Sequence, residues 1–422
     1  MKASAVVCVI LATAVPAGTA GGNAANGTKS TESRKQSLGD VETLVQGNAA
    51  FALDLYKELG SREGNLSFSP YSISLALGMT YAGARENTAK EMAKTLHFSL
   101  SQEKLHPAFF QLQTRLYEIE QRGNVVLDIA NALWPQRGHP FLKEYMALLR
   151  KHYAVFVRMV DYETDTARGK ARRVINTWAA DKTKGKITEL VQPEYLKADT
   201  RLVLTNAIYF NGRWRSEFDR KDTNDAPFHL SPEKSVQVPT MHQKRQFRYA
   251  ETESLQIVEL PYLAGGVFMI VLLPKKLDGL KEAEASLLVE NLRQWRDQLK
   301  PREVTVHLPR FTMTLGVPLK EVLAKMGIVE AFKPGAANFA GMDGLDWFYI
   351  SEVIHKAFID VDEEGTDAAA ASGAYVGMTG SPPPPVVFRA DHPFIFLIQE
   401  NRTGSILFLG RVTDPTQGSG EG

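Results

Sequence analysis

The sequence predicts one large α+β domain, in which helices and strands are mixed along the chain without an internal repeat. Its 422 residues are 44% apolar, which is enough to bury a large core. Helix-type and strand-type apolar patterns occur throughout, and no linker follows Asp40. The formal net charge of +1, with both signs interspersed, provides no field for nucleic acid or for an anionic membrane. Neither is therefore an expected partner.

Two apolar stripes at helical spacing and one helix-start signal, each followed by an end signal, predict three helices. The first stripe ends at Gly60. The second helix opens at Ser69-Pro70, an N-cap followed by a proline in the first turn, and Gly83 is placed to end it. The second stripe is followed by Gly327, a C-cap residue. The residues of the two stripes are Phe51, Leu55, Leu59 and Leu319, Val322, Leu323, Met326.

Strand patterns are found between and after these helices. Val304, Val306 and Leu308 alternate with polar residues, which is typical of a strand with one buried face. The continuous apolar run 267–273 predicts a strand buried on both faces. The runs 394–398 and 406–409 flank a turn sequence and predict a hairpin.

The N-terminus has the pattern of a secretory signal peptide over residues 1–20. Lys2 is followed by the apolar run 3–15, and Ala20 is the expected cleavage site. The alternative is a buried N-terminal helix. Residues 21–40 are polar and predict a disordered leader, so that the folded domain covers residues 41–417. The single cysteine, Cys8, lies in the signal, so the mature chain is expected to have no disulfide and no thiol chemistry.

Motifs for the common catalytic and metal sites are not found, and no cofactor is expected. His307 alternates with buried strand positions and is interpreted as a surface-facing strand residue rather than a ligand. The acidic residues Asp360, Asp362, Glu363 and Glu364 lie together at one strand end. Catalytic carboxylates usually converge from separate elements, so this cluster is interpreted as solvated charge.

The segment 363–385 is the most informative stretch of the chain. It is a long, nearly uncharged run of small residues between two strand patterns, and loops of this length usually have a function. Every second residue from Thr366 to Val376 is small or apolar, whereas the one charge, Asp367, belongs to the other set. Because alternate side chains of a strand face opposite sides, this loop could become a strand with one buried face. The alternative is a flexible Ala/Gly/Ser linker.

Six motifs, in order from residue 68 to residue 412, make the chain resemble the serpin family of protease inhibitors. The resemblance covers about residues 46–417. The motifs are Phe68-Ser69-Pro70-Tyr71-Ser72-Ile73, Asn176-Thr177-Trp178 with Thr183-Lys184-Gly185-Lys186-Ile187, Leu204 to Trp214, His355-Lys356-Ala357, Phe388 to Phe394 and Phe408-Leu409-Gly410-Arg411-Val412.

The resemblance implies a serpin fold of three β-sheets and eight or nine helices with an exposed reactive-centre loop at about 363–385. It also implies a monomer that is not an enzyme. A target serine protease would attack the loop, form a covalent acyl complex and be trapped as the cleaved loop inserts into the main sheet. A cysteine protease is a further possible target, since the trap needs only an acyl-enzyme.

Carried over residue by residue, the resemblance assigns three groups of positions. The hinge is Glu363, Glu364, Gly365, Thr366, Asp367, Ala368, Ala369, Ala370 and Ala371. The sheet-opening cluster is Ser69, Ser72, Asn206 and His355, with Trp214 at the top of the opening sheet. The reactive bond is Thr379–Gly380, with Met378–Thr379 as the alternative.

The residues at the predicted reactive bond suit the pockets of elastase-, chymotrypsin- or subtilisin-like enzymes. A trypsin-like protease, which cleaves after Lys or Arg, is not expected, because neither residue occurs between Lys356 and Arg389. Two other functions are left open: a non-inhibitory serpin acting as carrier, chaperone or storage protein, and an unrelated secreted enzyme. The sequence predicts export, to the medium or to a Gram-negative periplasm. The cysteine-free mature chain and the simple signal favour a bacterial source.

Overall fold

A computed structural model describes residues 24–122, 125–153, 155–263, 265–345, 347–364 and 386–418. The chain divides into two units, residues 1–39 and the folded domain Asp40–Gly422. Within the described residues there are ten α-helices: α1 (Ala24–Leu59), α2 (Pro70–Tyr81), α3 (Glu86–Thr95), α4 (Gln102–Glu120), α5 (Lys143–His152), α6 (Asp165–Lys182), α7 (Leu280–Ala285), α8 (Val289–Gln298), α9 (Lys320–Met326) and α10 (Ala340–Asp343).

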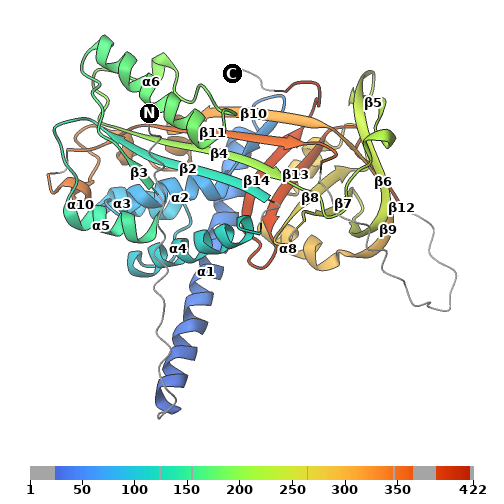
Figure 1. Cartoon of the computed structure of the whole chain (residues 1–422), viewed down its shortest axis with the longest axis horizontal. Coiled ribbons are helices and arrows are strands. Elements are labelled where there is room, and N and C mark those ends of the chain that lie inside the picture. The colour runs from blue at the N-terminus through green and yellow to red at the C-terminus, as the bar shows by residue number, and fades with distance from the viewer. Residues whose placement is uncertain are drawn as a thin grey trace, which may run out of the picture. The chain divides into compact units, whose positions relative to one another are not determined.

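Figure 1 shows how helices and strands are arranged. Fourteen strands are interspersed with these helices along the described part of the chain. They are β1 (Leu66–Phe68), β2 (Val125–Pro135), β3 (Val155–Val157), β4 (Leu202–Gly212), β5 (Asn224–Ser231), β6 (Lys234–Glu251), β7 (Leu255–Pro261), β8 (Val267–Pro274), β9 (Lys300–Pro309), β10 (Phe311–Pro318), β11 (Ile350–Val361), β12 (Val386–Arg389), β13 (Phe394–Glu400) and β14 (Ile406–Val412).

The strands form three sheets. The first has five strands in the order β10-β11-β4-β2-β3. The other two share the long strand β6, so that hydrogen bonds connect them into one nine-stranded sheet, in which β5 branches off β6. The first part of β6, residues 234–240, pairs with β5; residues 240–249 pair with β9, and β9 pairs with β12. The end of β6 pairs with β7, from which β8, β13, β14 and β1 follow.

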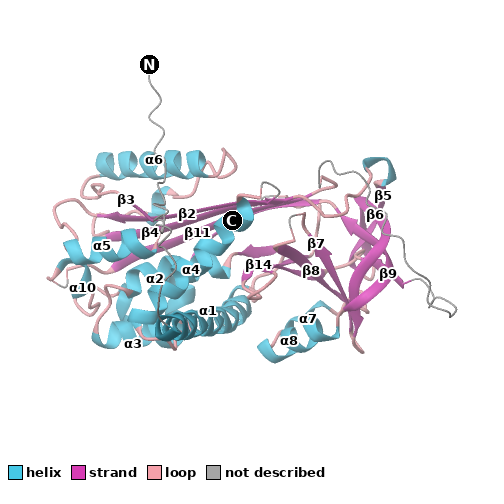
Figure 2. Cartoon of the chain, turned by 60° about the horizontal axis from the view of Figure 1, so that its bottom comes forward, coloured by secondary structure: helices cyan, strands magenta, loops and turns pink. Residues whose placement is uncertain are grey.

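Helix α2 lies in the middle of the domain, between the five-stranded sheet and strand β14. All twelve of its residues are buried, which explains why its sequence is apolar all round rather than striped. The opposite face of the five-stranded sheet is covered by α6, which packs Ile175 and Ala179 against Trp134, Ala207 and Phe358. Figure 2 shows α6 on one side of this sheet and α2 and α4 on the other. The sheet is therefore buried on both faces.

The last strand is locked to the start of the domain by two side chains. Arg411 is buried; its Nε donates to Gly64 O at 2.9 Å, and its Nη1 contacts Glu284 Oε1 at 2.6 Å. Asn65 Nδ2 donates to Asp414 O at 2.8 Å, and its Oδ1 accepts from Thr413 N at 2.7 Å. Gly410 lets β1 approach, since a Cβ there would lie 2.2 Å from Leu66 O.

The helix and strand predictions are confirmed. Ser69 caps α2, its Oγ accepting from Ser72 N at 3.2 Å, and α1 ends at Leu59, just before Gly60. Gly327 ends α9 with a φ of 122°, a conformation that side chains rarely adopt. The run at 267–273 is the fully buried β8, and β13 and β14 form the antiparallel hairpin.

The structure differs from the sequence predictions in two respects. Helix α1 begins at Ala24, inside the segment 21–40 that was expected to be a disordered leader. Residues such as Lys35 and Gln36 favour helix, and they can extend a helix whose core-facing turns begin at Val41. The described residues contain ten helices, whereas the resemblance implies eight or nine; α7 and α10 are only one or two turns long.

Candidate functional site

The central pair of the five-stranded sheet, β4 and β11, is parallel and runs from Leu202 opposite Ile350 to Phe210 opposite Ile359. We call the line between these two strands the seam. Both outer neighbours, β2 beside β4 and β10 beside β11, are antiparallel. A segment that turned back after β11 and entered the seam would be antiparallel to both of its neighbours. One parallel ladder would then become two antiparallel ladders, which are slightly more stable per residue.

A buried polar cluster lies under the middle of the seam. His355 of β11 is the register partner of Asn206 of β4, and both are fully buried. Ser69 N donates to His355 Nε2 at 3.1 Å, so the ring proton is on Nδ1, which donates to Asn206 Oδ1 at 2.5 Å. The imidazole therefore connects the N-terminus of α2 to both strands of the seam.

The amide of Asn206 completes the cluster. Its Nδ2 donates to Ser72 Oγ and to Asn131 Oδ1. Ser69, Ser72, Asn206 and His355 are thus brought together as the sequence predicts, and the structure adds Asn131 of β2. In the sequence, Asn131 could have been recognised as the one amide of the mostly apolar run 127–134, where it lies between two alanines. The cluster joins α2 to β2, β4 and β11, so any widening of the seam must break some of these bonds.

Burial lowers the pKa of His355 to about 3 and that of His106, whose Nδ1 is 2.7 Å from Tyr153 Oη, to about 4. A folded-state pKa below the unfolded value of about 6.5 means that the unfolded chain binds more protons. The stabilisation is therefore complete above pH 6.5 and is lost as the pH falls toward 4. We expect each histidine to lower the unfolding free energy by about 2–3 kcal/mol between pH 7.5 and pH 4.5.

The measurement is urea unfolding at both pH values for the parent protein and for His106→Gln. The variant should lose about half of the pH effect assigned to the two histidines. An unchanged pH dependence in the variant would contradict the assignment of this effect to His106.

The end of β11 is held by an aromatic pair and by charges. Trp214 Nε1 donates to Asp362 O at 2.9 Å, and the indole stacks on Tyr262 with ring centroids 4.4 Å apart. Trp214 therefore lies at the end of the seam where the chain leaves β11, as the sequence predicts. Thr223 Oγ1 donates to Glu363 Oε1 at 2.7 Å, and Arg220 contacts the carboxylate of Glu364.

The interpretation of this acidic cluster as solvated charge is wrong for Glu363. Glu363 is only 3% exposed, and its carboxylate lies 3.5 Å from Arg310 Nε. Burial raises the pKa of Asp362, an effect that the neighbouring carboxylates of Asp360 and Glu364 increase. Glu363 is enclosed because the segment after β4 and the start of β10 converge on the end of β11, a long-range arrangement that the sequence does not reveal. His307, also expected at the surface, is half-buried and stacks on His242 at 5.5 Å.

Removing the partner of a buried charge is expected to destabilise this corner. We expect Arg310→Ala to lower the unfolding free energy by about 1–2 kcal/mol, less than for a fully buried pair because Arg310 is half-exposed. The matched control is Lys244→Ala, which removes an exposed ion pair with Glu303 and should cost less than about 0.5 kcal/mol. Equal values in urea unfolding would contradict the buried role of Glu363.

The connection from α6 to β4 crosses the seam on the α6 side. Lys356 of β11 donates from Nζ to Glu189 O at 2.8 Å, and Arg201 N donates to Ser351 Oγ at 2.8 Å. Asn176 holds the connection against α6, its Oδ1 accepting from Val191 N at 2.8 Å. A strand that entered the seam would have to displace this connection.

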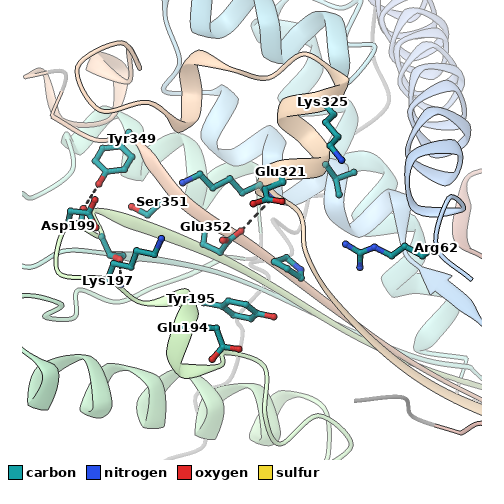
Figure 3. Close-up of a pocket in the computed structure, with 14 residues that line it drawn as sticks. Arg62, Glu194, Tyr195, Lys197, Asp199, Glu321, Lys325, Tyr349, Ser351 and Glu352 are labelled. Carbon is teal, nitrogen blue, oxygen red and sulfur yellow. Dashed lines mark hydrogen bonds between the residues drawn. The ribbon is translucent and has the colours of Figure 1, made fainter. Parts of the chain in front are cut away.

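A cavity of about 410 Å³ lies at the start of β11, far from Trp214 along the seam. Figure 3 shows that its walls come from both sides of the seam, with Tyr195, Lys197 and Asp199 on the β4 side and Glu321, Tyr349 and Glu352 on the other. Burial raises the pKa of Glu352, whose carboxylate accepts from Val353 N at 3.0 Å. The charges of the lining are mixed, so the cavity selects no simple class of ion.

The profile described as "Serpin (serine protease inhibitor)" matches residues 46–415. The chain belongs to the serpin family. Leukocyte elastase inhibitor of Xenopus laevis is 38% identical over 385 residues, covering 89% of this chain and all of the relative. The human leukocyte elastase inhibitor is 39% identical over 386 residues with the same coverage.

Solved serpin structures agree with this fold. Uncleaved ovalbumin superposes with a TM-score of 0.80 at 28% identity, covering 88% of this chain and all of ovalbumin. Serpin48 of the insect Tenebrio molitor gives a TM-score of 0.76 at 32% identity, with 88% and 98% covered. The predicted serpin fold is therefore confirmed. None of these named relatives is bacterial, so they give no support to the prediction of a bacterial source.

Within the serpin, the cluster residues and Trp214 lie in the described part, as do Glu363 and Glu364. The rest of the predicted hinge, 365–371, and both candidates for the reactive bond, at 378–380, lie outside the described residues, as does the predicted signal peptide 1–20. Among the described residues, no group of three or more metal-binding side chains is found. In the same part of the chain no helix is both long and apolar enough to cross a bilayer.

Proposed function

We propose that this serpin is a secreted suicide-substrate inhibitor of serine proteases with elastase-, chymotrypsin- or subtilisin-like pockets. The protease serine Oγ attacks the carbonyl carbon of the bait residue, Thr379 or Met378. The peptide bond breaks, the serine proton goes to the leaving amine, and an acyl ester joins the two proteins. The cleaved segment then enters the seam, and the protease stays attached.

The observation that carries the proposal is the match between the seam and the sequence that follows it. The seam lies between two parallel strands, and the chain that leaves β11 continues into the alternating segment from Thr366 to Val376. Its small and apolar positions can face the buried side of the sheet without the desolvation of a charge. Asp367 belongs to the other set. A segment with this pattern can therefore enter the seam without burying an unpaired charge.

Two observations support the choice of target. The absence of Lys and Arg between Lys356 and Arg389 leaves the acidic pocket of a trypsin-like protease without a partner. The relatives described above are named as inhibitors of leukocyte elastase. An elastase-like pocket accepts the small side chain of Thr379. Secretion is proposed from the signal pattern of residues 1–20, and the mass of the exported protein should correspond to cleavage after Ala20.

The experiment mixes the mature protein with pancreatic elastase, chymotrypsin, subtilisin and trypsin, and separates the products on a denaturing gel. The proposal expects a band of summed mass with at least one of the first three proteases and none with trypsin. Cleavage in the loop without such a band, for every protease, would contradict inhibition and indicate a non-inhibitory serpin. Sequencing the released C-terminal peptide then identifies the reactive bond.

A further inference from the structure

The turn that follows α6, residues 183–186, has a fixed conformation. Lys184 and Gly185 both have a positive φ, of 52° and 77°. Gly185 N and Lys186 N donate to backbone carbonyls of α6 and its cap at 2.8 and 2.9 Å. Thr183 is fully buried, and its Oγ1 accepts from the backbone of Ile187 at 3.0 Å. The side chains of Lys184 and Lys186 therefore start from defined positions on the α6 side of the five-stranded sheet.

A row of three side chains crosses the sheet beside this turn. Asp128 of β2, Tyr209 of β4 and Phe358 of β11 are successive register partners. The rings of Tyr209 and Phe358 are buried, and their centroids lie 5.4 Å apart on the two sides of the seam. This pair is next to the last pair of the seam, Phe210 with Ile359, at the end where the chain leaves β11. The row therefore lies at the entrance that a segment turning back after β11 would use.

The two lysines of the turn contact opposite sides of the seam. Lys184 Nζ lies 5.8 Å from the centroid of the Tyr209 ring and 3.0 Å from Asp128 Oδ2. Lys186 Nζ lies 5.1 Å from the centroid of the Phe358 ring. A cation over an aromatic face is attracted by the ring quadrupole. The turn thus connects β2 and β4 to β11, and we call the five residues Asp128, Lys184, Lys186, Tyr209 and Phe358 the clamp.

Entry of a strand into the seam is incompatible with the intact clamp. Neighbouring strands lie about 4.8 Å apart, so a strand between β4 and β11 would place the two rings roughly 10 Å from each other. Because Lys184 and Lys186 belong to one short, fixed turn, the contact with at least one ring is then lost. Both contacts therefore stabilise the closed seam and not the open one.

We propose that the clamp sets the rate at which the seam opens, with Lys184 and Lys186 as positioning residues that keep its entrance closed. This inference rests on the proposed function, in which the cleaved segment enters the seam, and it names the side chains that regulate that step. A cation–π contact at a partly exposed site corresponds to about a two- to fivefold change in a rate constant. Removing either lysine should therefore speed opening, not slow it.

The test measures how fast the whole mature protein takes up a fluorescein-labelled peptide with the sequence of residues 366–376, by fluorescence anisotropy and without a protease. We expect Lys184→Ala and Lys186→Ala each to speed uptake about two- to fivefold, and the double variant about tenfold. Lys186→Arg keeps a cation over the ring and should stay within about twofold of the parent. Lys170→Ala, which removes an exposed lysine near the start of α6, should do the same.

A double-mutant cycle distinguishes the clamp from a general loss of stability. Phe358→Leu keeps an apolar residue in β11 but removes the ring beside Lys186, and it should speed uptake about two- to fivefold. In the Lys186→Ala background the same change should add less than about twofold, because the contact is already lost. Urea unfolding of each variant checks that it is folded.

Two outcomes would overturn the proposal while leaving the proposed inhibition intact. One is an uptake rate that is equal in the parent and in both lysine variants. The other is an effect of Phe358→Leu that is the same with and without Lys186. A folded parent that takes up no peptide at all would instead contradict strand entry into the seam, and with it both the proposed function and the clamp.

Discussion

Thr366→Arg should convert this serpin from an inhibitor into a substrate of its target protease. The arginine would occupy the alternating set of small and apolar residues that must be buried when the cleaved segment enters the seam. Burying an unpaired charge costs several kcal/mol, and insertion would slow while hydrolysis of the acyl ester would not. We expect the yield of the covalent complex on denaturing gels to fall at least about tenfold, with a matching gain of cleaved serpin.

Asp367→Arg is the matched control, because it places the same side chain one position later, in the set that already carries a charge. Its complex yield should stay within about twofold of the parent. If both variants lost the complex equally, the two-faced interpretation of residues 366–376 would be wrong. A tenfold loss in the first variant alone supports the proposed insertion.

Asn206→Ala should cause the largest loss of stability among substitutions at the seam. The side chain makes hydrogen bonds to His355, Ser72 and Asn131, all of which are buried. Its removal leaves the His355 Nδ1–H and Asn131 Oδ1 without this partner, and each unsatisfied buried group costs about 1–3 kcal/mol. We expect the unfolding free energy to fall by about 3–5 kcal/mol in urea.

Asn211→Ala on the same strand provides the comparison, because Asn211 is only partly buried and lies near the end of β4. It should cost less than about 1 kcal/mol. A similar loss for both variants would show that β4 tolerates polar truncation uniformly and that the cluster has no special role. The proposed inhibition by loop insertion also predicts that the Asn206→Ala variant converts more readily than the parent to a loop-inserted, heat-stable form on mild warming.

The fold could be predicted from the sequence largely because its signals are local or occur in long motifs. The cap at Ser69, the turn at Gly327 and the run at 267–273 each depend on neighbouring residues, and all three appear in the structure. Gly410 belongs to a motif that the sequence analysis recognised. The structure shows why a glycine is needed there, since the backbone of β1 passes too close to leave room for a Cβ atom.

Features that depend on register and on long-range packing could not be predicted in the same way. Asn131 joins the cluster only because β2 pairs with β4 so that it faces Asn206. Glu363 is surrounded by acidic residues in the sequence, but Thr223 and Arg310, from distant segments, enclose it. The row of Asp128, Tyr209 and Phe358 likewise depends on the register of three strands.

The contacts of Asn65 have a consequence for the choice of expression host. Asn65-Leu66-Ser67 is an acceptor triplet for N-linked oligosaccharides, and such sugars are attached to the Nδ2 atom. In the folded serpin this atom donates to the carbonyl oxygens of Asp414 and Gln417. An oligosaccharide added before folding would therefore displace the C-terminal segment from β1, so a host without N-glycosylation should give the more uniform product.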